Sequence, residues 1–151
     1  MSVERVRALF REHGLQDGIH EFDESTETVE RAAAALGVKP ELIAKTLAFK
    51  LQDRGVLVVT KGDARIDNRK FKNLLGARAK MMSPEEVFEK TGHPVGGVCP
   101  FAITHMEIYL DSSLKKFPKV YPAAGSRNSC VEISPEKLQR ITGAQWVDVC
   151  K

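Results

Sequence analysis

Glycines and prolines gather in Gly92–Phe101, where the chain reads Gly-His-Pro-Val-Gly-Gly-Val-Cys-Pro-Phe. Glycine lets a backbone adopt positive φ and approach a ligand closely, whereas proline fixes φ and removes one donor. Backbone N–H groups exposed in this way can bind a carbonyl or phosphate oxygen, and the candidates are those of Gly96, Gly97, Val98 and Cys99. A structural turn between a helix and a strand is the alternative interpretation, because glycine and proline clusters are usually turns.

A lysine in an apolar setting is the second candidate. Lys45 lies within Leu42–Phe49, where the other residues are Leu, Ile, Ala, Thr, Leu, Ala and Phe. Such a lysine is either a buried cation with a function or a side chain that extends along apolar surface to keep its ammonium in water. Taken alone, the second interpretation is the more common one, since lysines are seldom fully buried unless they are paired.

Small and polar residues follow a predicted strand at Pro122–Ser129. Alanine and glycine leave room there for a ligand, and hydrogen-bonding groups come from Ser126, Arg127, Asn128 and Ser129. The alternative is a hairpin loop whose polar side chains bond their own backbone.

Several familiar chemistries have no signature in this sequence. It contains no Walker loop, no dinucleotide fingerprint, no His-Glu-x-x-His and no Cys-x-x-Cys, so we expect neither a cofactor nor a metal. His93 is the only histidine in the glycine-rich segment, and the spacing of residues assembles no nucleophilic triad. An enzyme built on this sequence would act by positioning and backbone electrostatics, with water or the substrate supplying the nucleophile.

Helices and strands that must position these residues follow one another without strict alternation. Apolar spacing and capping residues predict helices over Ser2–His13, Val29–Leu36 and Arg69–Leu75, and after Ser83 and Ser134. Strands are predicted over Ile19–Phe22, Ile43–Leu51, Gly55–Lys61, Val98–Ile103, Glu107–Leu110, Lys119–Tyr121, Val131–Ile133 and Trp146–Val149. This order predicts one α/β domain with a mixed sheet.

Length and composition agree with a single domain over residues 1–151, with 42% hydrophobic and 28% charged residues. The apolar runs are far shorter than the roughly 20 residues of a membrane span, and charges replace the apolar run of a signal peptide near the N-terminus. Three cysteines without close spacing predict a reducing compartment, and therefore a cytoplasmic protein.

The net charge of +3 is concentrated in one stretch. Residues 61–80 contain seven basic and two acidic side chains, a local excess of +5. Such a stretch could follow a phosphate backbone, and a solvated helix face explains it almost as well.

Four segments occur together in an order that resembles the YbaK/EbsC family, free-standing relatives of the editing domain of bacterial prolyl-tRNA synthetase. They are Ala44–Leu47, Gly92–Phe101, Tyr109–Leu114, and Ala124–Arg127 before Val131–Ile133. The resemblance implies a mixed, barrel-like α/β sheet flanked by helices. It also implies hydrolysis, in trans, of a mischarged aminoacyl-tRNA, such as tRNA for proline carrying alanine or cysteine.

The resemblance also assigns roles to residues, with mischarged tRNA and prolyl-tRNA synthetase as partners and no metal. Lys45 would help to hold the aminoacylated terminal adenosine, and the loop from Gly96 would present amides to the ester carbonyl, which makes Lys45, Gly96 and Gly97 the catalytic candidates. The substrate-binding candidates are His93, Val98, Cys99, Pro100, Gly125, Ser126, Arg127 and Ser129.

One residue departs from the pattern. The branch of the family that acts on cysteinyl-tRNA tends to carry serine where this chain has Ala123, which bears on cysteine specificity. Two other functions fit the same residues. One is a module that binds a tRNA end or a nucleotide without hydrolysis, and the other is a structural or regulatory partner of a synthetase.

Overall fold

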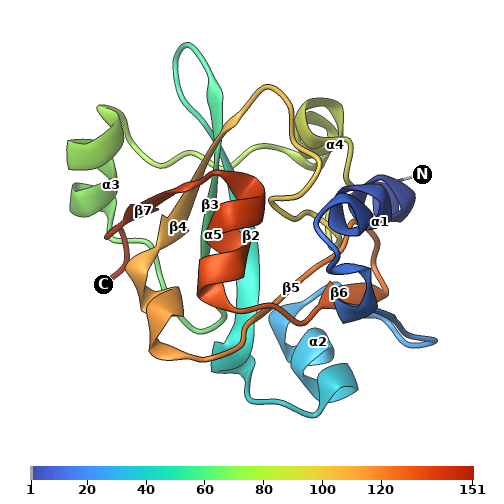
Figure 1. Cartoon of the computed structure of the whole chain (residues 1–151). Helices are drawn as coiled ribbons and strands as arrows, with labels where there is room; N and C mark the ends of the chain where they lie inside the picture. The colour runs from blue at the N-terminus through green and yellow to red at the C-terminus, as the bar shows by residue number, and fades with distance from the viewer. Residues whose placement is uncertain (1) are drawn as a thin grey trace.

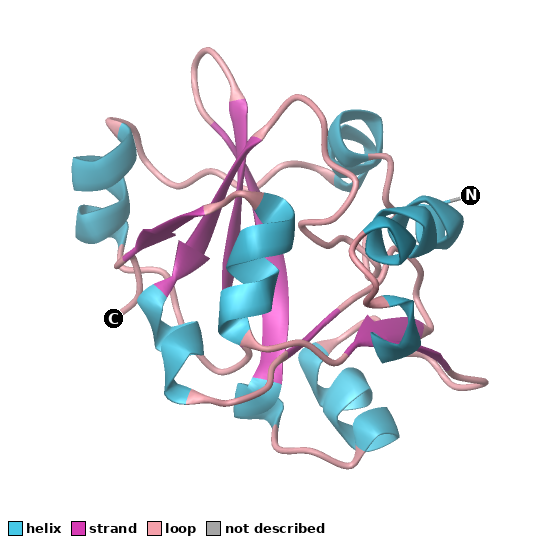
Figure 2. Cartoon of the chain, viewed as in Figure 1, coloured by secondary structure: helices cyan, strands magenta, loops and turns pink. Residues whose placement is uncertain are grey.

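A computed structural model describes residues 2–151 of the chain (Figure 1; Figure 2). Its centre is a five-stranded mixed sheet in the order β5-β2-β3-β4-β7, and β1 pairs with β6 in a two-stranded sheet. The strands are β1 (Ile19–Glu21), β2 (Ile43–Lys50), β3 (Gly55–Lys61), β4 (Glu107–Asp111), β5 (Tyr121–Pro122), β6 (Ser129–Val131) and β7 (Gln145–Val147). The α-helices are α1 (Ser2–Glu12), α2 (Val29–Leu36), α3 (Asn68–Leu75), α4 (Pro84–Thr91) and α5 (Pro135–Thr142).

The central strand of the sheet, β3, is buried along nearly its whole length. Residues 56–60 are all buried, as expected of an apolar run covered on both faces. β3 pairs antiparallel with β2, from Lys50 opposite Gly55 to Ala44 opposite Lys61, and it pairs parallel with β4. The long β2–β3 ladder therefore fixes the position of every side chain on β2.

Helices cover both faces of the sheet. On one face Phe10 of α1 and Leu138 of α5 pack into a buried cluster with Val59 of β3. On the other face Phe71 of α3 packs against Val58, the neighbour of Val59, because consecutive strand residues point to opposite sides. Figure 1 shows α5 in front of the sheet and α3 at its edge. These layers confirm the predicted mixed α/β class.

Local signals in the sequence account for most helix ends. The side chain of Thr28 accepts a hydrogen bond from the N–H of Arg31 at the start of α2, and Gly37 ends that helix with a φ of 69°.

α1, with 11 residues, is longer than the other helices described. None of the helices within residues 2–151 has the length and apolar character needed to span a bilayer.

The strand predicted over Val98–Ile103 is wrong, because this segment is a loop. Pro100 has no N–H to donate to a ladder, and Ala102 has a φ of 58°, a left-handed conformation that no strand contains. Two other predicted strands are displaced toward the N-terminus, since β6 ends at Val131 and β7 ends at Val147.

Helix α4 is fixed to β2 by its first turn. Ser83 accepts a hydrogen bond from the N–H of Glu86, and the Glu86 carboxylate accepts one from the N–H of Ser83 at 2.9 Å, which forms a capping box. The same carboxylate pairs with Lys50 of β2 at 3.1 Å. These bonds, from Ser83 first and then from Lys50, lower the pKa of Glu86 from 4.5 to about 2.

This pKa predicts how the stability of the protein changes with pH. Because the folded pKa of Glu86 is below the unfolded value, the ionised carboxylate stabilises the fold above about pH 4.5 and loses this effect as the pH falls toward 2. Glu86→Gln should therefore lower the urea midpoint at pH 7, and its difference from wild type should shrink by pH 3. Glu85→Gln, in the same helical turn, is the control. A difference that is equal at both pH values would contradict the prediction.

Candidate functional site

A cavity of about 280 Å³ lies where β2 passes the N-terminal end of α2, the start of α4 and the glycine-rich loop. Ala44, Thr46 and Ala48 alternate along β2, so their side chains share one side of the strand. Larger apolar residues that line the cavity are Val29, Ile43, Met81, Met82, Val87, Val95 and Val98. The polar residues that line it are Thr26, Glu27, Thr28, Lys45, Thr46, Tyr121 and Cys130.

Lys45 lines this cavity and is partly buried. Its Nζ donates a hydrogen bond of 2.6 Å to the carbonyl oxygen of Ala64, which follows β3. Burial lowers the pKa of Lys45 from 10.5, although the nearby Cys150 and Asp63 raise it. An ammonium that has lost part of its hydration and has one hydrogen-bond acceptor among residues 2–151 binds an anionic ligand well.

The segment that carries the Ala64 carbonyl is supported by the end of the chain, Val149–Lys151, which we call the C-terminal strap. The N–H of Asp67 donates to the carbonyl of Val149 at 2.8 Å, and the N–H of Lys151 donates to the carbonyl of Arg65 at 3.0 Å. Ile66 forms a β-bridge with Cys150. The strap therefore fixes the three residues that follow Ala64.

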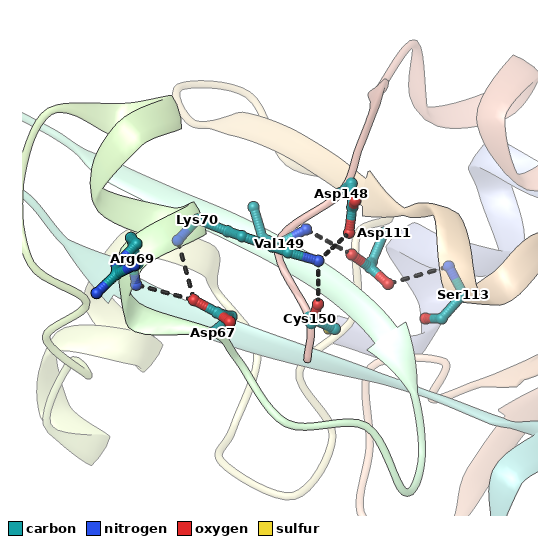
Figure 3. Close-up of polar contacts among 8 residues, drawn as sticks. All are labelled: Asp67, Arg69, Lys70, Asp111, Ser113, Asp148, Val149 and Cys150. Atoms are coloured by element: carbon teal, nitrogen blue, oxygen red, sulfur yellow. Dashed lines mark hydrogen bonds and ion pairs between the residues drawn. The ribbon is translucent and has the colours of Figure 1, made fainter.

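Asp111 holds the strap in turn, as Figure 3 shows. Its carboxylate accepts hydrogen bonds from the N–H groups of Val149 at 2.9 Å and Ser113 at 3.0 Å. Burial raises the pKa of this carboxyl, but hydrogen bonds from the Ser113 side chain first, and then from the N–H groups of Val149 and Ser113, outweigh burial and lower it. Lys70 also binds the strap, donating to the carbonyl of Cys150 at 2.9 Å, and it pairs with the carboxylate of Asp148, the residue before the strap, at 3.1 Å.

Removal of the Asp111 carboxylate should destabilise the protein. Hydrogen bonds to a charged group contribute about 1.5–3 kcal/mol each, so we expect Asp111→Ala to lower the free energy of unfolding by at least that amount. Asp148→Ala removes an exposed carboxylate of the neighbouring residue and should cost less than about 1 kcal/mol. Urea unfolding measures both changes. Equal losses in the two variants would show that Asp111 does not hold the strap.

The glycine-rich loop and the loop after β5, both predicted to contribute to the site, meet beside the cavity. Gly96 has a φ of 91°, and a methyl group on it would lie 2.7 Å from Cβ of Glu27. A methyl group on Gly97 would lie 2.6–2.8 Å from backbone atoms of Ser126. Arg127 joins the same two loops, because its Nε donates to the carbonyl of Val95 at 3.0 Å. Both glycines are therefore required by close packing.

The N–H groups of the glycine-rich loop differ in their partners. Gly97 donates to the carbonyl of Pro94 at 2.9 Å, so its N–H stabilises the turn. Within residues 2–151 we find no acceptor for the N–H groups of Gly96, Val98 and Cys99. Gly96 and Val98 also line the cavity. These two residues are accordingly the stronger candidates for binding a carbonyl oxygen.

His93 and Cys99 lie behind the loop and do not line the cavity. Nε2 of His93 bonds the carbonyl oxygen of Phe101 at 2.7 Å, and Nδ1 bonds Oγ of Ser2. Burial lowers the pKa of His93 and raises the pKa of the Cys99 thiol to about 12. Pro100 is also buried. The structure thus places His93, Cys99 and Pro100 where they support the glycine-rich loop.

The loop after β5 contributes one residue, Ala123, to the cavity wall. Gly125 has a φ of 98°, and a methyl group on it would lie 2.8 Å from Oγ of Ser2. Ser126 and Ser129 bond each other through their hydroxyl oxygens at 2.6 Å, and neither lines the cavity. Most polar side chains of this loop therefore bond within it, and Arg127 is exposed at the rim.

The structure adds site residues that the sequence analysis missed. Thr46 is buried, lines the cavity, and its hydroxyl has no hydrogen-bond partner among residues 2–151. Glu27 and Thr28, at the start of α2, also line it. The signal available for Thr46 was its position beside Lys45, whereas Glu27 reaches the site only through the packing of α2 against the glycine-rich loop. Within residues 2–151 no three or more His, Cys, Asp or Glu side chains gather as metal ligands would.

The basic stretch over residues 61–80 is partly neutralised by ion pairs. Lys61 pairs with Asp63 at 3.1 Å, and Lys70 pairs with Asp148 at 3.1 Å. Arg65 lies close enough to Lys45 to lower its pKa. The positive charge of this stretch thus extends to the lysine of the site.

Comparison with known proteins identifies the family. Residues 23–141 match the model of a family described as the aminoacyl-tRNA editing domain. The chain therefore belongs to the aminoacyl-tRNA editing domain family, which confirms the resemblance drawn from four motifs.

Relatives of the chain include free-standing proteins and parts of larger ones. It is 47% identical over 154 residues to the uncharacterized protein YwhH of Bacillus subtilis (strain 168), covering all of this chain and 98% of that protein. It is 34% identical over 134 residues to the proline–tRNA ligase of Bacillus licheniformis, covering 85% of this chain and 23% of the ligase. The chain thus spans about a quarter of the ligase.

Solved structures share the whole fold. One, described as a candidate trans-editing enzyme for prolyl tRNA synthetase, is 33% identical with a TM-score of 0.90, covering 99% of this chain and 97% of that chain. Another, described as the hypothetical protein APE2540, is 35% identical with a TM-score of 0.89, covering 97% of this chain and 99% of that chain.

Proposed function

We propose that the protein is an aminoacyl-tRNA deacylase that acts in trans and hydrolyses the ester of a mischarged tRNA. The substrate we infer is tRNA for proline carrying a small amino acid, such as alanine or cysteine. The observation that carries the proposal is that Lys45 lines one cavity together with Gly96 and Val98, whose N–H groups have no acceptor among residues 2–151. Membership of the editing family supports the same reaction.

The chemistry needs little from side chains. An aminoacyl ester is more reactive than an amide, and attack by water places negative charge on its carbonyl oxygen. Each backbone N–H aimed at such an oxyanion lowers the barrier by about 2.7–4 kcal/mol in other enzymes. In this proposal the N–H groups of Gly96 and Val98 bind the oxygen, and Lys45 holds a phosphate of the terminal nucleotide. A water molecule attacks the ester carbonyl, a hydroxyl of the terminal ribose assists that attack, and the ester oxygen of the ribose leaves with a proton.

The size of the cavity supports a small aminoacyl group. Its volume of about 280 Å³ is just below the range of about 300–1,000 Å³ for small-molecule sites. Ala44, Ala48 and Ala123 leave room at the wall, while Met82 and Val87 limit the length of a bound side chain. Size alone discriminates weakly, since one methylene group changes binding by about 1–3 kcal/mol.

We further propose that the protein works in the cytoplasm with tRNA and in association with prolyl-tRNA synthetase. The basic stretch over residues 61–80 suits contact with the phosphates of an acceptor end. Because ion pairs neutralise part of it, we expect modest binding that weakens with salt.

A deacylation panel tests the proposal. Purified protein is incubated with alanyl-, cysteinyl-, seryl- and threonyl-tRNA for proline, and release of the amino acid is measured against the spontaneous rate. We expect at least one ester to be hydrolysed, with the smaller side chains favoured. If all four decay at the spontaneous rate while unacylated tRNA binds tightly, the protein is a binding module and the deacylase proposal is wrong.

A further inference from the structure

One acidic and one basic residue line the cavity among the described residues. Among the described residues that line it, Glu27 is the only carboxylate and Lys45 is the only cation. An aminoacylated tRNA end also carries two charges close to its ester, a phosphate on the nucleotide and an ammonium on the α-carbon of the amino acid. In the proposed function Lys45 binds the phosphate of the terminal nucleotide. The α-ammonium of the amino acid then has no assigned partner, and Glu27 has no assigned role.

Glu27 lies beside the atoms that would bind the ester. Its Cβ is so close to Gly96 that a methyl group there would approach it to 2.7 Å. In an aminoacyl ester the nitrogen is attached to the carbon next to the carbonyl carbon. A carbonyl oxygen bound by the N–H of Gly96 therefore brings the α-ammonium into the neighbourhood of the Glu27 carboxylate.

The present partners of Glu27 hold it loosely. Its carboxylate lies 3.5 Å from Arg31 and 3.9 Å from Arg127, both longer than the 2.7–2.9 Å of a charge-assisted hydrogen bond. All three side chains are at least one-third exposed. The carboxylate oxygens thus keep the capacity to accept hydrogen bonds from a bound ammonium.

We propose that Glu27 binds the α-ammonium of the aminoacyl group, so that the protein selects esters with a free α-amino group over N-acylated or peptidyl esters. This inference rests on the proposed function, because it assumes that the ester carbonyl binds at Gly96. N-acylation removes the positive charge and leaves the Glu27 carboxylate facing a neutral amide. The same residue would then protect peptidyl-tRNA from hydrolysis.

Kinetics on a matched pair of substrates provide the first test. Alanyl-tRNA and N-acetylalanyl-tRNA for proline are compared with wild type, Glu27→Gln, and Glu24→Gln, an exposed carboxylate outside the cavity. We expect wild type and Glu24→Gln to prefer the free amine about tenfold to a hundredfold in kcat/KM, and Glu27→Gln to lose that preference by slowing only alanyl-tRNA. Equal rates on both esters in wild type, or an equal fall on both in Glu27→Gln, would overturn the inference.

A binding measurement separates this inference from the proposed function. The probes are 3′-alanylamido-adenosine 5′-phosphate, whose amide resists hydrolysis, and its N-acetylated form. Calorimetry should show tighter binding of the free amine to wild type and no difference with Glu27→Gln. If wild type hydrolyses no ester, the deacylase proposal fails, but a preference that depends on Glu27 still supports this inference. Equal affinities for the two probes in wild type would refute it.

Discussion

We expect replacement of Lys45 by alanine to remove the proposed deacylase activity while the fold remains intact. Among the described residues, Lys45 is the only cationic residue that lines the cavity. Loss of a charge-assisted contact to phosphate misplaces the ester relative to Gly96 and Val98, and misplacement by about 1 Å can cost a hundredfold. We expect kcat/KM to fall by at least a hundredfold, measured as release of the amino acid from the best substrate of the panel.

Measurements of stability distinguish a loss of activity caused by the missing ammonium from one caused by unfolding. Burial lowers the pKa of Lys45, so at pH 7 the charged form opposes folding, and this effect disappears as the pH rises toward the unfolded value of 10.5. Lys45→Met keeps the apolar part of the side chain and should unfold at the same temperature as wild type or a higher one. Lys39→Ala, an exposed lysine outside the cavity, should keep full activity. A Lys45→Met variant that is folded and fully active would disprove the assigned role.

Gly97→Ala is expected to have the second largest effect on activity. The added methyl group would lie 2.6–2.8 Å from the backbone of Ser126, which cannot rotate away as a side chain can. The loop must therefore shift, and the N–H groups of Gly96 and Val98 shift with it. We expect a loss of about 1–3 kcal/mol in the free energy of unfolding and at least a tenfold loss in kcat/KM.

Gly143→Ala is the matched control for this variant. Gly143 has a φ of 67° and no atom within 4 Å of the added methyl group, so the substitution strains only the backbone at the end of α5. It should cost about 1–2 kcal/mol in stability and leave kcat/KM unchanged. If both variants lose the same activity, the effect of Gly97→Ala comes from instability and not from the geometry of the loop.

Local rules predicted much of this fold from the sequence. The apolar run of β3 and the cap and terminal glycine of α2 gave the bounds that the structure has, because hydrogen bonds and burial within a few residues decide them. The strand predicted over Val98–Ile103 was wrong because it relied on apolar residue types alone. Its residues are apolar, but Pro100 and the left-handed Ala102 make it a buried loop that packs against His93.

The candidate site was predictable only where residue type carries the signal. Lys45 and Gly96 were candidates because an embedded lysine and paired glycines are unusual. Glu27 precedes the N-cap residue of α2 and carries no distinguishing signal in the sequence, and only the packing of distant segments brings it to the cavity. The acceptor of Lys45 is a backbone carbonyl, at Ala64, which no residue type can reveal.

The C-terminal strap has a consequence for how the protein acquires its function during folding. The bond between Asp111 and Val149 joins residues 38 positions apart, whereas the β2–β3 hairpin joins close neighbours in the sequence. Contacts that close long loops form more slowly, since chain entropy is lost before they contribute. A folding intermediate with the hairpin alone would display Lys45 but would not fix its acceptor at Ala64. We therefore expect substrate binding to appear in the last phase of refolding, together with protection of the strap amides from hydrogen exchange.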